Sequence, residues 1–350
     1  MKTIRDLDPK DKTILIRTDY NVPLKNRHVE NDLRIRASLP TINYLLDHKA
    51  KRIFLISHLG RPEGKESPDS SLAPIADTLN KLLPNQKVEF LPLPSTNKKL
   101  DVSPDTKIVL LENLRFDPGE EANSPDFIQK IVNSTGAEIF VQDGFAVIHR
   151  AHASTDAITH LLPSYAGFLV EKEVENLQKA LQNPKSPVLL IIGGAKVEDK
   201  QPLIDKFTKI ADQIVVGGKI AADGYQTNNP KIYVAEDFDE DASFAKLDIG
   251  PLATAKIADF IASAKTIIWN GLLGYAEDPA YATASTITAE LIGEKKDATT
   301  IICGGDTTSF VEDLAKSHPN LKYSLISTGG GAALEFLLGK ELPGIKAISS

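Results

Sequence analysis

Residues 188–196 read VLLIIGGAK: five apolar residues, then two glycines, an alanine and a lysine. Such an apolar run is typical of a strand buried on both faces, and the glycines after it predict a tight loop that can approach a ligand. The arrangement recurs, because short Ile- and Val-rich runs alternate with segments of helical period. Buried strands separated by helices indicate parallel sheets, so the sequence predicts an α/β fold.

The order of these segments predicts two lobes. Strands are expected at 13–17, 52–57, 107–111, 138–142, 188–192, 213–216, 266–268, 300–303 and 323–326, and helices at 34–48, 73–83, 125–133 and 171–181. We expect two doubly wound lobes, each with a mainly parallel sheet, joined by a connecting helix. The expected domains are 1–165, a connecting helix at 166–184, a second domain at 185–335, and a tail at 336–350 that packs back on the first.

The composition places the chain among ordinary globular proteins. Of its 350 residues, 42% are hydrophobic and 25% charged, and the net charge of -7 argues against a nucleic-acid-binding face. Cys303 is the single cysteine, which excludes an internal disulfide and favours a small buried side chain at a strand end. Neither a signal peptide nor a membrane span is predicted, so a cytoplasmic location is expected.

Polar and basic residues follow the apolar strands of the first half. Because parallel strands end at one edge of a sheet, these residues are expected to converge on one crevice. Several guanidiniums with few carboxylates in the same loops need an anion, and arginine suits phosphate and carboxylate. The residues are Asp19, Asn21, Arg34, His58, Arg61, Arg115 and Arg150. A metal held by His149 and His152 is a weaker alternative, since no nearby carboxylate completes a ligand set.

Glycines follow the strands of the second half. They stand at Gly193-Gly194, Gly217-Gly218, Gly271, Gly304-Gly305 and Gly329-Gly330-Gly331, with Lys196, Lys200, Asp306 and Thr307 beside them. Glycine loops at helix starts can bind phosphate, lysines add positive charge, and an aspartate can hold Mg2+. Neither the Walker pattern nor G-x-G-x-x-G occurs, so a nucleotide site of another kind is predicted. The acidic run 236–241 is interpreted as a solvated face rather than a calcium loop.

Eleven motifs in order resemble the phosphoglycerate kinase family over almost the full length of the chain. They are RTDYNVPL, NDLRIRASLPTI, SHLGRP, LLENLRFDPGEE, HRAHAST, AGFLVEKE, GGAKVEDK, DIGP, WNG, GGD and STGGGAALEFLLGKELPG. The resemblance implies a monomeric glycolytic kinase that moves the 1-phosphoryl group of 1,3-bisphosphoglycerate to ADP with Mg2+, giving 3-phosphoglycerate and ATP after lobe closure. It implies no nucleic-acid or membrane partner.

The resemblance also implies a role for each matching residue. Arg34 and Lys196 would be catalytic, facing and steadying the transferring group. The triose would be bound by Asp19, Asn21, Arg34, His58, Arg61, Arg115 and Arg150. The nucleotide would be bound by Gly194, Lys200, Gly218, Glu277, Gly305, Asp306, Thr307, Gly329 and Gly330. Glu277 would hold the ribose, and Asp306 would engage Mg2+ largely through the nucleotide phosphates.

The chain departs from the family pattern mainly on the nucleotide side. Lys219 stands where a third glycine is expected, Leu272 replaces a proline, and Cys303 a glycine. The segment 223–235 is short, with room for a loop and one strand at 231–234 where the family has an extra helix beside the adenine. We therefore expect weakened base selectivity with the reaction retained. A non-catalytic regulator that binds nucleotide or triose is the alternative, and an NAD-linked dehydrogenase is remote because the dinucleotide fingerprint is missing.

Overall fold

The structure is a computed structural model that describes residues 1–349. The chain divides into two compact units, one formed by Met1–Lys172 with the segment that begins at Glu341, the other by Glu173–Lys340. The division falls within helix α4 (Phe168–Gln182). Among the described residues we find no helix with the length and apolar character needed to span a membrane.

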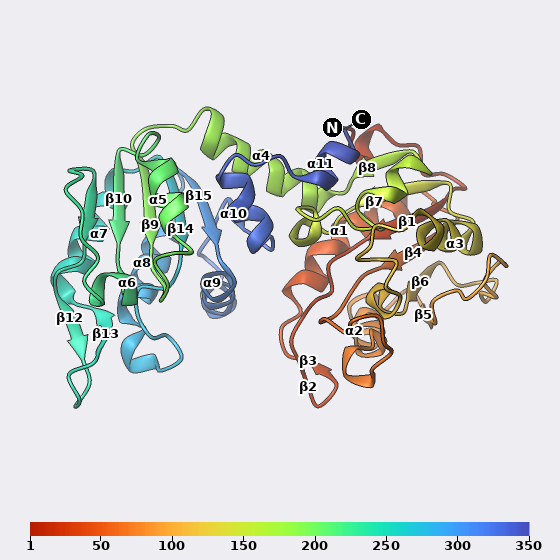
Figure 1. The fold of residues 1–350 in the computed structure, drawn as a ribbon, viewed down its shortest axis with the longest axis horizontal. Helices are drawn as coiled ribbons and strands as arrows, with labels where there is room; N and C mark the ends of the chain where they lie inside the picture. The colour runs from red at the N-terminus through yellow and green to blue at the C-terminus, as the bar shows by residue number, and fades with distance from the viewer. Residues whose placement is uncertain (350) are drawn as a thin grey trace. The chain divides into compact units, whose positions relative to one another are not determined.

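The first unit is built on a six-stranded sheet in which every pair of neighbouring strands is parallel. Its strand order is β5-β6-β4-β1-β7-β8, and Figure 1 shows helices flanking it. The strands are β1 (Thr13–Arg17), β4 (Arg52–Ile56), β5 (Val88–Leu91), β6 (Ile108–Leu111), β7 (Ile139–Gln142) and β8 (Ser164–Ala166). A hairpin is formed by β2 (Leu24–Lys25) and β3 (His28–Val29).

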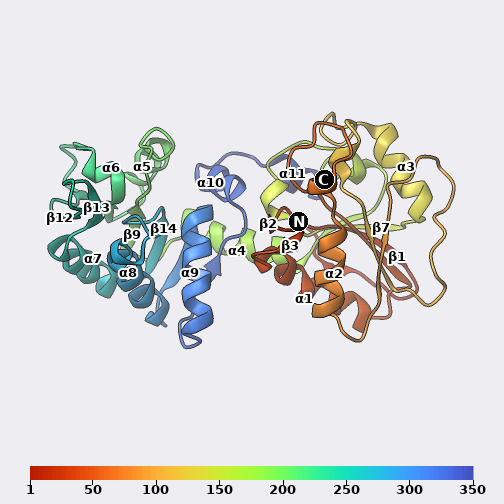
Figure 2. The ribbon, with the colours of Figure 1, turned by 90° about the horizontal axis from the view of Figure 1, so that it is seen from below.

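The helices of the first unit are amphipathic and cover this sheet. They are α1 (Leu33–Asp47), α2 (Ala73–Leu82), α3 (Pro125–Thr135) and α11 (Pro343–Ala347), and Figure 2 shows α1 beside α2. Short 3-10 helices lie at Ile4–Asp6, Pro68–Ser70, Leu114–Phe116, Phe145–Val147 and Ala157–His160. Helix α11 is held in this unit by the amide of Gly344, which donates to the carbonyl of Ile148 at 2.9 Å.

The second unit has its own parallel six-stranded sheet, in the order β11-β10-β9-β14-β15-β16. The strands are β9 (Val188–Ile192), β10 (Gln213–Val216), β11 (Ile232–Val234), β14 (Thr266–Asn270), β15 (Thr299–Cys303) and β16 (Leu325–Ile326). The helices are α5 (Gln201–Phe207), α6 (Gly218–Ala222), α7 (Pro251–Ser263), α8 (Thr283–Glu294), α9 (Gly305–Ser317) and α10 (Gly331–Leu337), with a 3-10 helix at Pro279–Tyr281. The predicted class, two α/β lobes with parallel sheets, is confirmed.

Local sequence signals explain where several elements begin and end. The side chain of Ser124 accepts from the amide of Phe127 and caps the start of α3 at Pro125; the helix ends at Thr135 and is followed by Gly136, whose φ of 67° suits glycine. Strands β1 and β9 are buried along their whole length: β9 is apolar throughout, and β1 buries Thr13 and Arg17 beside its three apolar residues.

The acidic run differs from its prediction. Residues Phe238–Glu240 form β12, which pairs with β13 (Lys246–Ile249) in an antiparallel hairpin. The carboxylate of Asp237 accepts from the amides of Leu252 and Ala253, both at 2.8 Å, and so caps the start of α7. Part of this run is therefore structural rather than only a solvated face. The segment between α6 and β12 holds only β11, in agreement with the prediction for 223–235.

Candidate functional site

The basic residues predicted in the first half gather at one edge of the first sheet. Strand β1 pairs with β4 and β7, and β4 pairs with β6, all in parallel, so the loops that follow these strands meet. Each loop supplies at least one predicted residue, and helix α1 supplies another. We call Arg34, His58, Arg61, Arg115 and Arg150 the basic cluster.

Helix α1 places Arg34 against the loop that follows β1. Its Nη1 lies 2.8 Å from Oδ2 of Asp19 and donates to the carbonyl of Asn21 at 3.0 Å. The amide of Gly60 donates to Oδ1 of Asn21 at 2.9 Å, which fixes the loop that carries Arg61. The structure therefore brings Asp19, Asn21 and Arg34 together, while Arg61 is exposed.

The other two arginines of the basic cluster come from the loops after β6 and β7. Arg115 donates through Nη1 to the carbonyl of Gly60 at 2.7 Å, and its Nε lies 3.0 Å from Oε1 of Glu121. Arg150 donates through Nε to Nε2 of His149 at 3.3 Å. Partial burial lowers the pKa of the Arg115 guanidinium, and the charges of neighbouring arginines act in the same direction.

His58 lies at the centre of the basic cluster and is 3% exposed. Burial, and then the charges of Arg17, Arg115, Arg34 and Arg150, hold the pKa of His58 well below its ordinary value. The imidazole is therefore neutral near pH 7, although Oδ1 of Asp19 lies 3.8 Å from its Nδ1. These four arginine charges act together on one buried ring, as expected of a site that binds an anion.

Two charged residues under the basic cluster were not predicted. Arg17, the last residue of β1, and Glu120, in the loop after β6, are both 0% exposed, and their side chains approach to 3.7 Å. The expectation of few carboxylates in these loops was wrong, because Asp19 and Glu121 pair with Arg34 and Arg115. A carboxylate beside a guanidinium holds it in place for a ligand.

The glycines of the second unit lie at the reversal point of its sheet. Counted along the chain, the parallel strands stand in the order 3-2-1-4-5-6, so the direction reverses between β9 and β14, where such sheets bind ligands. A Cβ on Gly193 would lie 2.1 Å from the carbonyl oxygen of Leu272, and one on Gly271 would lie 2.2 Å from that of Gly193. Glycine is required here because the two loops cross backbone to backbone.

Gly194 and Gly218 belong to the same packed arrangement. Gly194 has a φ of 92°, and its amide donates to the carbonyl of Leu272 at 2.8 Å. Gly218 opens α6 with a φ of 60°, and a Cβ there would lie 2.7 Å from the same carbonyl oxygen. These two predicted residues therefore lie where the loops after β9, β10 and β14 pack together, which we call the floor of these loops. The amide of Gly194 already has a hydrogen-bond acceptor within the protein.

Charged and hydroxyl groups lie around this floor. Nζ of Lys200 donates to Oδ1 of Asn270, and burial lowers the pKa of Lys200. Thr307, buried at the start of α9, accepts from the amide of Gly271 at 2.9 Å. Lys196 is exposed on the loop after β9. Residues Gly305 and Asp306 are exposed at the start of the 13-residue helix α9, where helix amides favour an anion.

The remaining predicted nucleotide residues come from two further loops. Glu277 is exposed and accepts from the hydroxyl of Tyr275 at 2.8 Å. The amide of Gly329 donates to the hydroxyl of Ser327 at 3.0 Å, and Gly330, with a φ of 49°, precedes α10 with no atom within 4 Å of a Cβ position. Cys303 is fully buried at the end of β15, as predicted, and burial raises the pKa of its thiol.

Sequence reasoning missed Glu173, which holds the loop before α10. It is fully buried on α4, and its carboxylate accepts from the amide of Thr328 at 2.7 Å and from the hydroxyl of Ser327 at 2.8 Å. The last E of the motif AGFLVEKE is this residue, but the sequence gives no sign that it contacts a loop about 150 residues away.

Comparisons with known proteins agree with this geometry. A family model described as phosphoglycerate kinase matches residues 4–232 and 222–340. The phosphoglycerate kinase of Moorella thermoacetica is 38% identical over 394 positions, which cover 99% of this chain and 98% of the relative. That of Acidobacterium capsulatum is 39% identical over 404 positions, with the same coverage. The chain belongs to the phosphoglycerate kinase family.

Solved structures of phosphoglycerate kinases have the same fold. The structure from Coxiella burnetii matches with a TM-score of 0.81 at 34% identity, covering 99% of this chain and 98% of the other. The structure from Pyrococcus horikoshii matches with a TM-score of 0.84 at 26% identity, covering 100% and 98%. The alignments with the two bacterial relatives exceed the 350 residues of this chain, so those phosphoglycerate kinases carry insertions.

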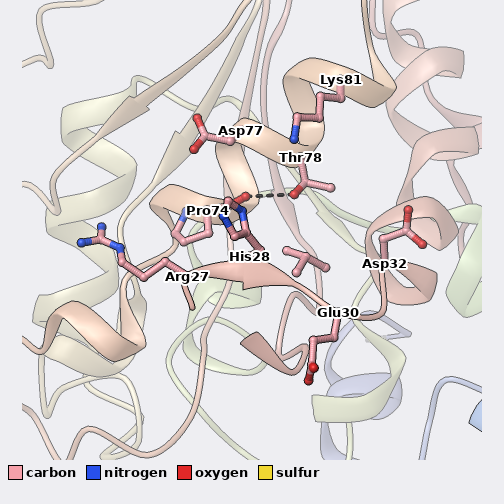
Figure 3. Close-up of a pocket in the computed structure, with 9 residues that line it drawn as sticks. Arg27, His28, Glu30, Asp32, Pro74, Asp77, Thr78 and Lys81 are labelled. Atoms are coloured by element: carbon pink, nitrogen blue, oxygen red, sulfur yellow. Dashed lines mark hydrogen bonds between the residues drawn. The ribbon is translucent and has the colours of Figure 1, made fainter. Parts of the chain in front are cut away.

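A cavity of about 520 Å³ is lined by none of the residues of the basic cluster, although one of its lining residues, Asp32, belongs to the motif NDLRIRASLPTI. Figure 3 shows it between the β2–β3 hairpin, which carries His28, and helix α2, which carries Asp77, Thr78 and Lys81. Three acidic and three basic or imidazole side chains line it, so it has no strong preference for either sign of charge. Its lining residues are Arg27, His28, Val29, Glu30, Asp32, Pro74, Asp77, Thr78 and Lys81.

Proposed function

We propose that this chain reversibly transfers the 1-phosphoryl group of 1,3-bisphosphoglycerate to ADP, giving 3-phosphoglycerate and ATP. The observation that carries the proposal is the basic cluster, in which Arg34, Arg115 and Arg150 act on one buried, neutral His58. Such a cluster suits a small ligand with several phosphate or carboxylate groups. The family to which the chain belongs supports the choice of 3-phosphoglycerate.

The triose is proposed to bind to the first unit through Asp19, Asn21, Arg34, His58, Arg61, Arg115 and Arg150. In the direction of ATP use, the acceptor is the carboxylate of 3-phosphoglycerate, which is already ionised at about pH 7. The reaction then needs no general base. Its rate depends on positioning the two reactants and neutralising the charge on the transferring group, roles that we assign to Arg34 and Lys196.

The nucleotide is proposed to bind to the second unit. Lys200, Thr307 and the amides at the start of α9 would hold the phosphates, while Glu277 would hold the ribose. Gly305, Gly329 and Gly330 would supply further contacts, and Gly194 and Gly218 would shape the floor of the loops beside the nucleotide. The carboxylate of Asp306 is a hard oxygen ligand at the same helix start, which fits Mg2+ bound with nucleotide. When bound, Mg2+ would neutralise phosphate charge. The proposed triose site and the proposed nucleotide site, which we call the two half-sites, belong to one chain. We therefore infer that a monomer is sufficient and that the two half-sites close on the reactants.

A coupled assay for ATP formation from 1,3-bisphosphoglycerate and ADP tests this proposal. We expect turnover at a rate typical of kinases, on the order of 1–100 per second. Calorimetry should show one site for 3-phosphoglycerate and one for ADP. Binding of both ligands without any ATP formation would instead support the non-catalytic alternative, and absence of 3-phosphoglycerate binding would refute the assignment of the first unit.

A further inference from the structure

The guanidinium of Arg17 lies beneath the basic cluster and contacts three of the loops that build it. Nε donates to the hydroxyl of Ser154 at 2.7 Å, Nη1 donates to the carbonyl of Thr18, and Nη2 lies 3.2 Å from Nδ1 of His58. Arg17 is 0% exposed and therefore does not meet solvent or ligand directly. Any effect it has on a bound triose must act through a neighbouring side chain.

The hydrogen bonds that lead to Arg17 have a fixed direction. A guanidinium has only donors, so the hydroxyl oxygen of Ser154 must accept from Nε and direct its own proton elsewhere. That proton points to Oε1 of Glu120, 2.6 Å away, and the amide of Ser154 donates to Oε2 at 3.1 Å. Glu120 is 0% exposed and balances the charge of Arg17. The chain therefore runs from Arg17 through Ser154 to Glu120.

The same rule decides the state of His58. Because Nη2 of Arg17 can only donate, Nδ1 of His58 must be the acceptor and carry no proton. In a neutral imidazole the proton then resides on Nε2. Among the described residues Nε2 has no hydrogen-bond partner, so this N–H is the group of His58 left to meet a ligand.

We propose that Arg17, held by Ser154 and Glu120, is a positioning residue that fixes His58 as the tautomer with its proton on Nε2. His58 then offers one hydrogen-bond donor to an oxygen of the triose without adding a positive charge. This role rests on the proposed function, because it assigns His58 to the triose ligand. The groups that face His58 are Arg17, Arg34, Arg115, Arg150 and Asp19, and the four arginines all oppose a second proton on the ring.

The tautomer can be measured without substrate and without activity. Protein labelled with 15N in its seven histidines is examined by two-bond 1H–15N correlation spectra between about pH 6 and 8, and the signal of His58 is assigned by its loss in His58→Gln. We expect the Nδ1 shift of an unprotonated nitrogen and the Nε2 shift of a protonated nitrogen throughout. A protonated Nδ1 in the unsubstituted protein would overturn the proposal.

The kinetic test is a double-mutant cycle between Arg17 and His58. We expect Arg17→Gln to raise KM for 3-phosphoglycerate roughly tenfold, which corresponds to about 1.4 kcal/mol, with kcat changed less than about threefold. In a His58→Gln background the same change should add less than about twofold, because its effect passes through the imidazole. Additive effects in the cycle would show that Arg17 acts elsewhere.

Two further variants keep the test decisive. Arg52→Gln is the matched control. Arg52 is the first residue of β4, at the end of the strand away from His58, and donates to the carbonyls of Thr106 and Ser103, so this substitution should leave KM unchanged. If Arg17→Gln does not fold, Ser154→Ala interrupts the chain with little change in volume and should shift both the His58 spectrum and KM in the same direction. If the unsubstituted protein forms no ATP, the proposed function is refuted but the proposed role of Arg17 is not, because the His58 spectra do not depend on activity.

Discussion

At the scale of single residues, charge and burial decide what each side chain can do. Arg34 and Lys196 are both assigned to the transferring group, but Arg34 is fixed by Asp19 whereas Lys196 is exposed on a loop. Arg17 and Glu120 are buried and act only on their neighbours. Charged residues therefore divide into those proposed to meet a ligand and those that hold others in place.

Lys196→Ala should lower kcat on the order of 10²- to 10³-fold, the loss typical of removing one group that stabilises developing charge. KM for 3-phosphoglycerate should change little, because the triose contacts are assigned to the first unit. Initial rates over both substrates check this, with Lys209→Ala, another exposed lysine of the second unit, as the control. An unchanged kcat would remove Lys196 from its assigned role.

Asp143 should make stability depend on pH. It is fully buried, its Oδ1 accepts from the amide of Leu169, and burial raises its pKa from 3.8 to about 8. The folded protein therefore holds a proton that the unfolded chain releases above about pH 4, so this group makes folding less favourable as pH rises from about 4 to 8.

Asp143→Asn keeps the shape and removes this titration. We expect it to flatten the decline in unfolding free energy between about pH 5 and 8, with a gain on the order of 1–3 kcal/mol at about pH 8. Urea denaturation at several pH values measures this. A decline as steep as in the unsubstituted protein would show that Asp143 is ionised when folded.

The predicted part of the site consists of residues that stand just after apolar strands, because strand ends mark the ligand edge of a parallel sheet. Arg17 could not be found this way, since in ILIR it reads as the end of a strand. Glu120 and Glu121 are neighbours in sequence, yet one is fully buried and the other is exposed. Only the packing of the loops distinguishes them.

At the scale of elements, helix α4 holds the loop before α10, which is proposed to bind the nucleotide. Glu173→Gln should weaken the hold on Ser327 and Thr328, and we expect KM for ADP to rise about three- to tenfold, a loss of roughly 1 kcal/mol. Triose binding should be unchanged. Glu175→Gln, an exposed position on the same helix, is the control for both measurements. Equal effects of the two substitutions would argue against a specific role for the buried carboxylate.

The short segment between α6 and β12 should alter base selectivity. The two ranges matched by the family model overlap at residues 222–232, from the end of α6 into this segment, and the segment has only β11. We expect GDP to compete with ADP to within about tenfold in kcat/KM, because the segment proposed to lie beside the base is short while the residues proposed to bind the phosphates are all present. A preference for ADP of several orders of magnitude would contradict this expectation.

The long buried strands were predicted to within a few residues because their apolar runs have one interpretation. Strands β5 and β8 and the two hairpins were missed, since their residues are mostly half-buried or exposed and lack a clear period. Helix α6 has five residues, too few for a helical period.

At the scale of the whole molecule, the two units have separate cores, and one natural probe distinguishes them. Trp269, the single tryptophan, is fully buried in β14 of the second unit and packs in a cluster made only of residues from that unit. A second described cluster lies entirely within the first unit. Each ligand should therefore stabilise chiefly the unit to which it binds.

We expect ADP with Mg2+ to shift the unfolding transition seen by Trp269 fluorescence, by about 2.7 kcal/mol at 100 times its Kd, and 3-phosphoglycerate to shift it much less. Circular dichroism, which sees both sheets, should instead respond to each ligand. The control is Arg34→Ala, in which the effect of 3-phosphoglycerate should vanish and that of ADP remain. Equal shifts of the fluorescence transition by both ligands would mean that the two units unfold as one cooperative system, so that binding to either half-site stabilises the whole chain.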